Sequence, residues 1–270
     1  IVGEFLDDNG KIYQFLMIRD SVAKEKTKSK IVKKISKIPT VWTPNKSKGF
    51  ENPIKSKSIL FKNATLWTNE EIGIIKSADI AISNGKIIAI GEDLDTNQIP
   101  NIENINLEII NAKGKHITSG IIDEHSHIAI SRGVNESSQA ITAEVSIADV
   151  INPDDQNIYR QLACGVTCSQ LLHGSANPIG GQSALIKLRW GKTAEEMKIK
   201  NCDGFIKFAL GENVKQSNWG DFNTTRYPQT RMGVEQVFYD AFYRAKKYKK
   251  EWSNYNSLSL RKKRETNPPR

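Results

Sequence analysis

Cysteine and histidine are both scarce in this chain, which holds three cysteines and four histidines among 270 residues. Cys164, Cys168 and Cys202 are odd in number and include no Cys-x-x-Cys pair, so they do not predict a disulfide framework. No apolar run approaches the length of a membrane span, and no signal-peptide pattern is present. We therefore expect no membrane partner. The chain starts at Ile1 rather than at a methionine, so the sequence leaves both cytoplasm and periplasm open as compartments.

Positive charge is concentrated in one segment. Residues 21–57 hold eleven lysines against two glutamates, which accounts for the whole net charge of +9. These lysines lack the interleaved aromatic residues on which single-stranded nucleic acids stack. A second basic cluster spans residues 244–264. We interpret the two as a solvated linker and a solvated helix end, and we expect no nucleic-acid partner.

Turn and strand signals divide the chain into four parts. Residues 1–20 carry an Asp-Asn-Gly turn between apolar runs and are expected to be the tail of an upstream β segment. Residues 21–57 are predicted to be an extended linker rich in lysine and proline. Residues 58–118 hold several strand patterns and an Asn-Gly hairpin turn, which indicates a small β domain. Residues 119–270 alternate strands with helices, a pattern that favours a parallel sheet or barrel.

The strand that opens this last part carries two of the four histidines, in the run Ser119-Gly-Ile-Ile-Asp-Glu-His-Ser-His. Strand side chains alternate between faces, so His125 and His127 point the same way if the segment is extended. Two neighbouring imidazoles on a rigid strand form half of a site for Zn²⁺ or a similar ion. A strand with two incidental histidines is the alternative.

The order of these motifs resembles the amidohydrolase superfamily. A β domain leads through Ala-Lys-Gly-Lys into Gly-Ile-Ile-Asp-x-His-x-His, Gly165-Val-Thr is similar to the family's second strand, and Asp203-Gly-Phe-Ile-Lys is similar to its fourth. The likeness covers residues 58–257 and is strongest to the imidazolonepropionase- and prolidase-related branch, in large bacterial proteins. Ser119 departs from the proline that the family usually has there. The resemblance implies an incomplete (β/α)8 barrel of the TIM type, about its first four strands, over residues 119–270. It also implies that residues 58–118 are part of a flanking β-sandwich.

Strand parity singles out one lysine. Lys207 alternates with Ile206 and Phe208, so it faces the barrel interior if these two pack against outer helices. An interior lysine is unfavourable unless it is modified or paired, although it can also extend to the barrel rim. In the family, a fourth-strand lysine carboxylated by CO₂ can bridge two metals, so the resemblance implies that carboxylated Lys207 completes the histidine site. Glu212 is the rival ligand, because some members use a glutamate. One or two divalent ions are implied, with Zn²⁺ preferred.

Three further residues are candidates for binding a small-molecule substrate. His173 ends the second strand, on the face where barrel active sites form, and a structural role for it is equally open. Asn213 and Arg226 lie in a loop on the same face. The sequence does not specify the oligomeric state.

Part of the expected site has no counterpart in this chain. A (β/α)8 barrel takes about 250 residues, and no histidine follows His173. The family's later ligands, and the aspartate that serves as general base, are therefore expected downstream. We expect the chain to be the N-terminal portion of a longer metal-dependent hydrolase of C–N bonds, acting on cyclic or peptide-like amides and inactive alone. A non-catalytic fragment or scaffold that binds a partner through its basic segments is the alternative.

Overall fold

The computed structural model describes residues 2–16, 41–52, 54–100, 102, 107–220 and 226–270. The chain divides into two units, Ile1–Thr40 and Val41–Arg270. In the first, β1 (Val2–Leu6) pairs antiparallel with β2 (Ile12–Leu16), which is the expected hairpin. Most of the predicted 21–57 linker lies outside the described residues. Its later part is held in place, because the indole nitrogen of Trp190 donates a hydrogen bond to the Lys48 carbonyl at 2.7 Å.

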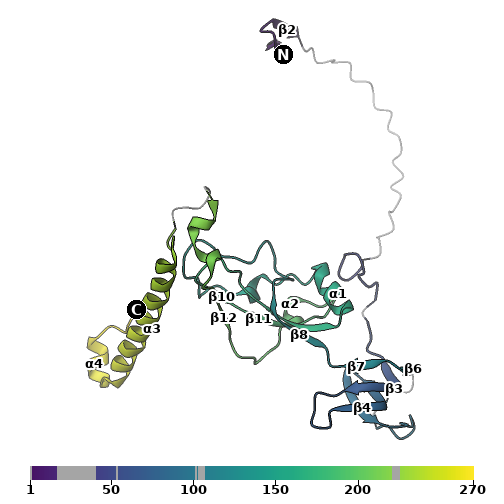
Figure 1. Ribbon diagram of the computed structural model, residues 1–270. Helices are drawn as coiled ribbons and strands as arrows, with labels where there is room; N and C mark the ends of the chain where they lie inside the picture. Colours follow the sequence, from purple (N-terminus) through teal and green to yellow (C-terminus); the bar gives the residue numbers. More distant parts are fainter. Residues whose placement is uncertain (1, 17–40, 53, 101, 103–106, 221–225) are drawn as a thin grey trace, which may run out of the picture. The chain divides into compact units, whose positions relative to one another are not determined.

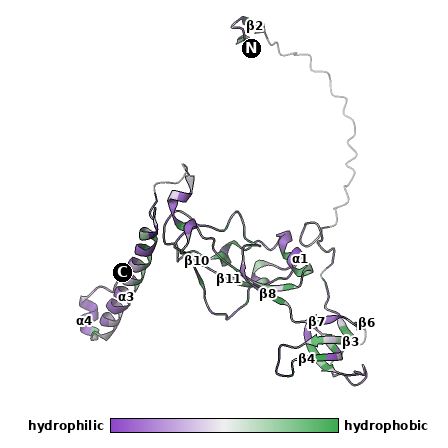
Figure 2. Ribbon diagram, viewed as in Figure 1, coloured by the Kyte–Doolittle hydropathy of each residue, from purple (hydrophilic) through white to green (hydrophobic). Residues whose placement is uncertain are grey.

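A five-stranded sheet begins the second unit (Figure 1). Its strands are β3 (Ser58–Trp67), β4 (Ile74–Ser83), β5 (Lys86–Gly91), β6 (Leu107–Asn111) and β7 (His116–Thr118). The spatial order is β5-β4-β3-β6, with β7 also paired to β3. Alternate residues of β3, including Leu60, Ala64 and Leu66, are buried, as expected for a strand with one covered face. Figure 2 shows the hydrophobic residues concentrated along β3 and β4.

The rest of the second unit mixes strands and helices. Its strands are β8 (Ile121–Ser126), β9 (Val166–Leu171), β10 (Ile179–Gln182), β11 (Ala184–Lys187) and β12 (Ile206–Phe208). Its helices are α1 (Gln156–Ala163), α2 (Ala194–Met197), α3 (Arg231–Ser257) and α4 (Leu260–Glu265), with short 3₁₀ turns η2 (Ile147–Val150), η3 (Glu212–Val214) and η4 (Gln216–Asn218). This confirms a mixed α/β chain with several sheets, whereas the barrel itself remains a prediction.

The connection from β8 through α1 to β9 is the βαβ unit that the sequence pattern favours. β8 and β9 are parallel, and Ile158 of α1 is fully buried in the same core cluster as Leu171 of β9. β11 differs from the expectation of a parallel sheet, because it pairs antiparallel with β9. The chain between them folds tightly over His173: a Cβ on Gly180 would lie 2.7 Å from the ring nitrogen Nδ1. Glycine at this position lets β10 pass close to the His173 ring.

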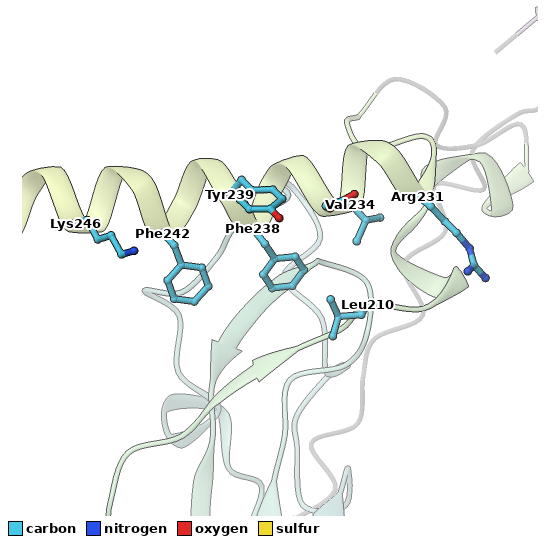
Figure 3. A pocket seen from close by; sticks show the side chains of 8 residues that line it. Leu210, Arg231, Val234, Phe238, Tyr239, Phe242 and Lys246 are labelled. Carbon is cyan, nitrogen blue, oxygen red and sulfur yellow. The ribbon is translucent and has the colours of Figure 1, made fainter.

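The long helix α3 extends the predicted helix by a few residues. Thr230 caps its start by accepting a hydrogen bond from the Gly233 amide, and Val234 and Val237 are buried. Phe208 of β12 makes edge-to-face contacts with Phe238 and Phe242 of α3, at centroid distances of 5.6 and 6.2 Å. Figure 3 shows Val234, Phe238 and Phe242 on the side of the helix that faces Leu210, around an apolar groove of about 500 Å³.

None of the helices in the described part of the chain is long and apolar enough to cross a membrane.

Candidate metal centre

The two histidines at the end of β8 lie side by side. Their ring centroids are 5.1 Å apart and the rings are nearly perpendicular. Ser126, between them, is buried, whereas His125 and His127 are exposed, so the backbone alternates as an extended strand does. Asp123 accepts a hydrogen bond from the His125 amide at 3.2 Å, which stiffens the strand end. Both imidazoles are therefore displayed on one side of the same strand.

A backbone carbonyl fixes the orientation of His127. Its Nδ1 lies 2.9 Å from the Leu172 oxygen, and because a carbonyl only accepts, Nδ1 carries the proton. Nε2 of the neutral ring then keeps its lone pair. Metal-binding histidines are commonly oriented in this way, by donating from one ring nitrogen while the other binds the ion.

Lys207 reaches the histidines from a different sheet. Its Nζ lies 3.4 Å from Nε2 of His125, although 82 residues separate the two. Lys207 is half-buried between the exposed side chains of Ile206 and Phe208, and Phe208 packs on α3 on the other side of β12. The strand thus directs its lysine to the histidines and its phenylalanine to the helix.

The local electrostatics favour neutral histidine. The pKa of His125 is lowered from its ordinary value of 6.5, first by burial, then by the positive charges of Lys207 and His127, against an opposing effect of Asp123. A neutral imidazole is the form that binds a metal. Conversion of the Lys207 ammonium to a carbamate would replace the adjacent positive charge with a negative one.

The rival ligand Glu212 is engaged elsewhere. Its carboxylate forms ion pairs with Lys215 and Arg231 and accepts a hydrogen bond from Asn218. These contacts lower the pKa of Glu212 to about 2. The structure therefore brings Lys207, rather than Glu212, within hydrogen-bonding distance of His125.

His173, a candidate for substrate binding, has both ring nitrogens occupied. Its side chain is 1% exposed. Nδ1 donates to the Gly174 carbonyl at 2.9 Å, and Nε2 accepts from the Glu136 amide at 2.8 Å. This geometry favours the structural role that the sequence left open, since the ring ties two loops together.

Arg226, another candidate, also contacts the protein itself. Its guanidinium donates to the carbonyls of Ser137, Gln139 and Ala176 and to the side-chain oxygen of Asn177. It also lies over the ring of Trp219 at 5.7 Å. Arg226 thus holds the loop after β8 against the loop after β9.

Asn213, the third candidate for substrate binding, lies on a cleft wall. Its amide nitrogen donates to the Ser175 hydroxyl at 2.9 Å, and both residues line a cleft of about 440 Å³. The sequence missed Ser175 and the Leu172 carbonyl. A backbone oxygen carries no side-chain signal, and a serine in a glycine-rich loop is too common to be distinctive.

Among the described residues, no three His, Cys, Asp or Glu side chains gather closely enough to bind a metal. The arrangement around His125 therefore becomes a set of three ligands only if Lys207 is included. Two imidazole nitrogens and one carbamate oxygen form a mixed N/O set of the kind that Zn²⁺ accepts. Such a set is typical of metal-dependent hydrolases.

Comparison with known proteins finds amidohydrolases among the relatives of the chain. No protein-family model matches the chain. Amidohydrolase tasK of Hapsidospora irregularis is 31% identical over 219 residues, covering 70% of this chain and 22% of the relative. An imidazolonepropionase of Colwellia psychrerythraea is 34% identical over 174 residues, covering 60% of this chain and 41% of the relative. The crystal structure of an amidohydrolase from Thermotoga maritima matches with a TM-score of 0.60 and 36% identity, over 73% of this chain and 50% of that one.

The chain belongs to the amidohydrolase superfamily. It spans 22% and 41% of the length of the two curated relatives and half of the Thermotoga chain.

Proposed function

We propose that this chain supplies the first ligands of a metal-dependent hydrolase that cleaves C–N bonds in cyclic or peptide-like amides. His125, His127 and a carboxylated Lys207 would hold one or two divalent ions, with Zn²⁺ as the expected metal. The observation that carries the proposal is the 3.4 Å approach of the Lys207 nitrogen to Nε2 of His125, from a strand distant in sequence. The names of the relatives, amidohydrolase and imidazolonepropionase, agree with this reaction class.

The residues fit such a metal by their chemistry. His127 keeps the nitrogen opposite the Leu172 contact available, and the lowered pKa of His125 favours the neutral form of that ring. Lys207 is half-buried, so its amine can be reached by CO₂ while it stays close to His125. A carbamate on Lys207 would supply an anionic oxygen ligand beside that imidazole.

A divalent ion at this position would polarise the amide carbonyl and lower the pKa of water towards neutrality. The chain's own residues serve to orient that ion: Leu172 fixes the His127 ring, and Asp123 fixes the strand end through the His125 amide. The overall reaction adds one water across the C–N bond and yields a carboxylate and a protonated amine. The aspartate that the family resemblance implies as general base would take the proton from water and pass it to the leaving nitrogen.

Metal analysis of the purified protein tests the proposal. We expect bound zinc, and we expect His127→Ala to lose it. His116→Ala is the matched control, because His116 is a histidine of β7 whose Nδ1 accepts from the Trp67 indole at 2.8 Å. Zinc content that is equal in His127→Ala and His116→Ala would refute the proposal.

A further inference from the structure

A polar cleft lies beside the strand ends that carry the candidate ligands. It has a volume of about 440 Å³ and is lined by Asn135, Ser175, Ala176, Asn213, Asn218 and Trp219. Ser175 follows Leu172, the partner of His127, by three residues, which places it within about 11 Å along the chain. Asn213 follows Lys207 by six residues. Both walls of the cleft therefore continue from segments that position the candidate metal centre.

Hydrogen bonds between its own residues hold the cleft in shape. Asn213 donates to Ser175 at 2.9 Å, which joins the two walls. The Trp219 indole nitrogen donates to the Asn213 carbonyl at 2.7 Å. Asn218 donates to the Glu212 carbonyl at 2.8 Å. Because Arg226 also braces the loops behind Ala176, the cleft is preorganised, which reduces the entropy lost when a ligand binds.

The polar groups left over in the cleft suit an amide. Within the described residues, the Ser175 hydroxyl hydrogen and the Asn135 amide nitrogen remain as donors, while the side-chain oxygens of Asn213 and Asn218 remain as acceptors. An amide offers one N–H and one carbonyl, and so complements such a mixed set. Trp219 adds a flat apolar surface against which a planar amide can lie.

The same lining disfavours a charged ligand. None of the six lining residues carries a formal charge. The Arg226 guanidinium, which would be the natural partner of a carboxylate, donates to the Ser137 and Ala176 carbonyls and to Asn177 instead. An anion would therefore find no counter-charge among the lining residues.

We propose that this cleft is the subsite that selects substrate, by binding the uncharged planar amide portion of the molecule. The cleft's place in catalysis rests on the proposed function. Its affinity for a neutral amide does not depend on metal, because none of its lining residues is a candidate ligand.

The test uses metal-free protein and two chemically related probes, succinimide and succinamate. Succinimide is a neutral cyclic amide near pH 7, and succinamate is its ring-opened anion. Binding is measured by NMR, from the shifts of the Trp219 indole N–H and the asparagine side-chain amides. We expect saturable shifts with succinimide and at least about tenfold weaker binding of succinamate, given the cost of desolvating an unpaired charge.

Variants of the lining residues test whether succinimide binds in the cleft. Ser175→Ala and Asn213→Ala are each expected to weaken succinimide binding about tenfold, as loss of a hydrogen bond to the ligand does. Asn254→Ala, on the exposed surface of α3, is the matched control and should bind as the parent does. Circular dichroism establishes that each variant is folded, and Ser175→Ala, the smaller change, decides the matter if Asn213→Ala unfolds.

His127→Ala separates this proposal from the metal proposal. The variant should lose zinc and keep succinimide binding. If zinc is never bound but the succinimide results hold, only the metal proposal fails. Absence of saturable shifts, equal binding in Ser175→Ala and the parent, or succinamate binding as tight as succinimide would each overturn the cleft proposal.

Discussion

Two neighbouring residues of β12 face opposite environments. Lys207 points to the imidazoles of β8 and lies 3.4 Å from His125, whereas Phe208 packs edge-to-face on two phenylalanines of α3. The strand is only three residues long, so this alternation fixes both contacts together. Phe208, on one face, holds the strand against α3. Lys207, on the other face, places its amine beside His125.

The two cavities repeat this contrast. The groove on the α3 side is lined mainly by apolar and aromatic residues such as Leu210, Val234 and Phe238 (Figure 3). Three of the six residues that line the cleft between Ser175 and Asn213 carry side-chain amides. Polar recognition is therefore expected in this cleft rather than in the groove on α3. Substitutions on each side of β12 should have separable effects.

The largest effect is expected from Lys207. We predict that Lys207→Ala weakens zinc binding at least about a hundredfold, because a lost ligand costs more than the roughly 10–100-fold loss of an outer-shell partner. Lys207→Arg should do the same, since a guanidinium does not form the carbamate. Zinc titration by calorimetry measures both. The control is Lys187→Ala, because Lys187 is an exposed lysine of β11. An equal loss of zinc affinity in Lys187→Ala would show that the effect does not depend on the position of Lys207.

A smaller and different effect is expected on the other face. Phe208 is 41% exposed and makes two edge-to-face contacts. Phe208→Ala should lower the free energy of unfolding by about 1–2 kcal/mol, from lost apolar burial and aromatic contact. The folded variant should bind zinc as the parent does. The control is Phe205→Ala, because the Phe205 side chain is 47% exposed. Denaturant unfolding measures the stability of both variants. Equal destabilisation by the two substitutions would contradict the proposed packing of Phe208 on α3.

The smallest effect is expected at Glu212. Its carboxylate is held by Lys215 and Arg231 rather than by the histidines. Glu212→Gln should change zinc affinity by no more than about twofold, as expected for a surface ion-pair residue outside the site. A large loss of zinc in this variant would restore Glu212 as the bridging ligand.

The ion pairs of Glu212 with Lys215 and Arg231 are expected to make a pH-dependent contribution to stability. The pKa of Glu212 is lowered from 4.5 to about 2 by hydrogen bonds from Lys215, Arg231 and Asn218. Since the folded pKa is depressed, these contacts stabilise the fold above pH 4.5 and lose that contribution as the pH falls towards 2. NMR titration of the side-chain carboxyl carbon measures this directly, and an ordinary pKa near 4.5 would show that the ion pairs do not persist in solution.

Short-range patterns predicted the local structure well. β3 runs from Ser58 to Trp67, as its run of β-forming residues indicates, and the Asn-Gly turn joins β4 to β5. Alternation along β8 and β12 predicted which side chains share a face, and it singled out Lys207. These features depend on backbone periodicity, which the sequence expresses residue by residue.

Features that depend on contacts between distant parts of the chain were harder to predict from the sequence. The antiparallel pairing of β11 with β9 is one that no periodicity encodes. The contacts of Arg226 with three carbonyls depend on loops that lie 50 and 87 residues away. The same holds for the Leu172 carbonyl beside His127. Whether the sheets close into a barrel is likewise a matter of tertiary packing, and it stays a prediction.

The central claim is that Lys207, as a carbamate, shares a metal with His125 and His127. Carbon-13 NMR of the protein loaded with zinc and ¹³C-bicarbonate tests it most directly. The account predicts a carbamate resonance that is present in the parent and in Glu212→Gln and absent in Lys207→Ala. Bound zinc without any carbamate resonance, or zinc retained in full by Lys207→Ala, would contradict it.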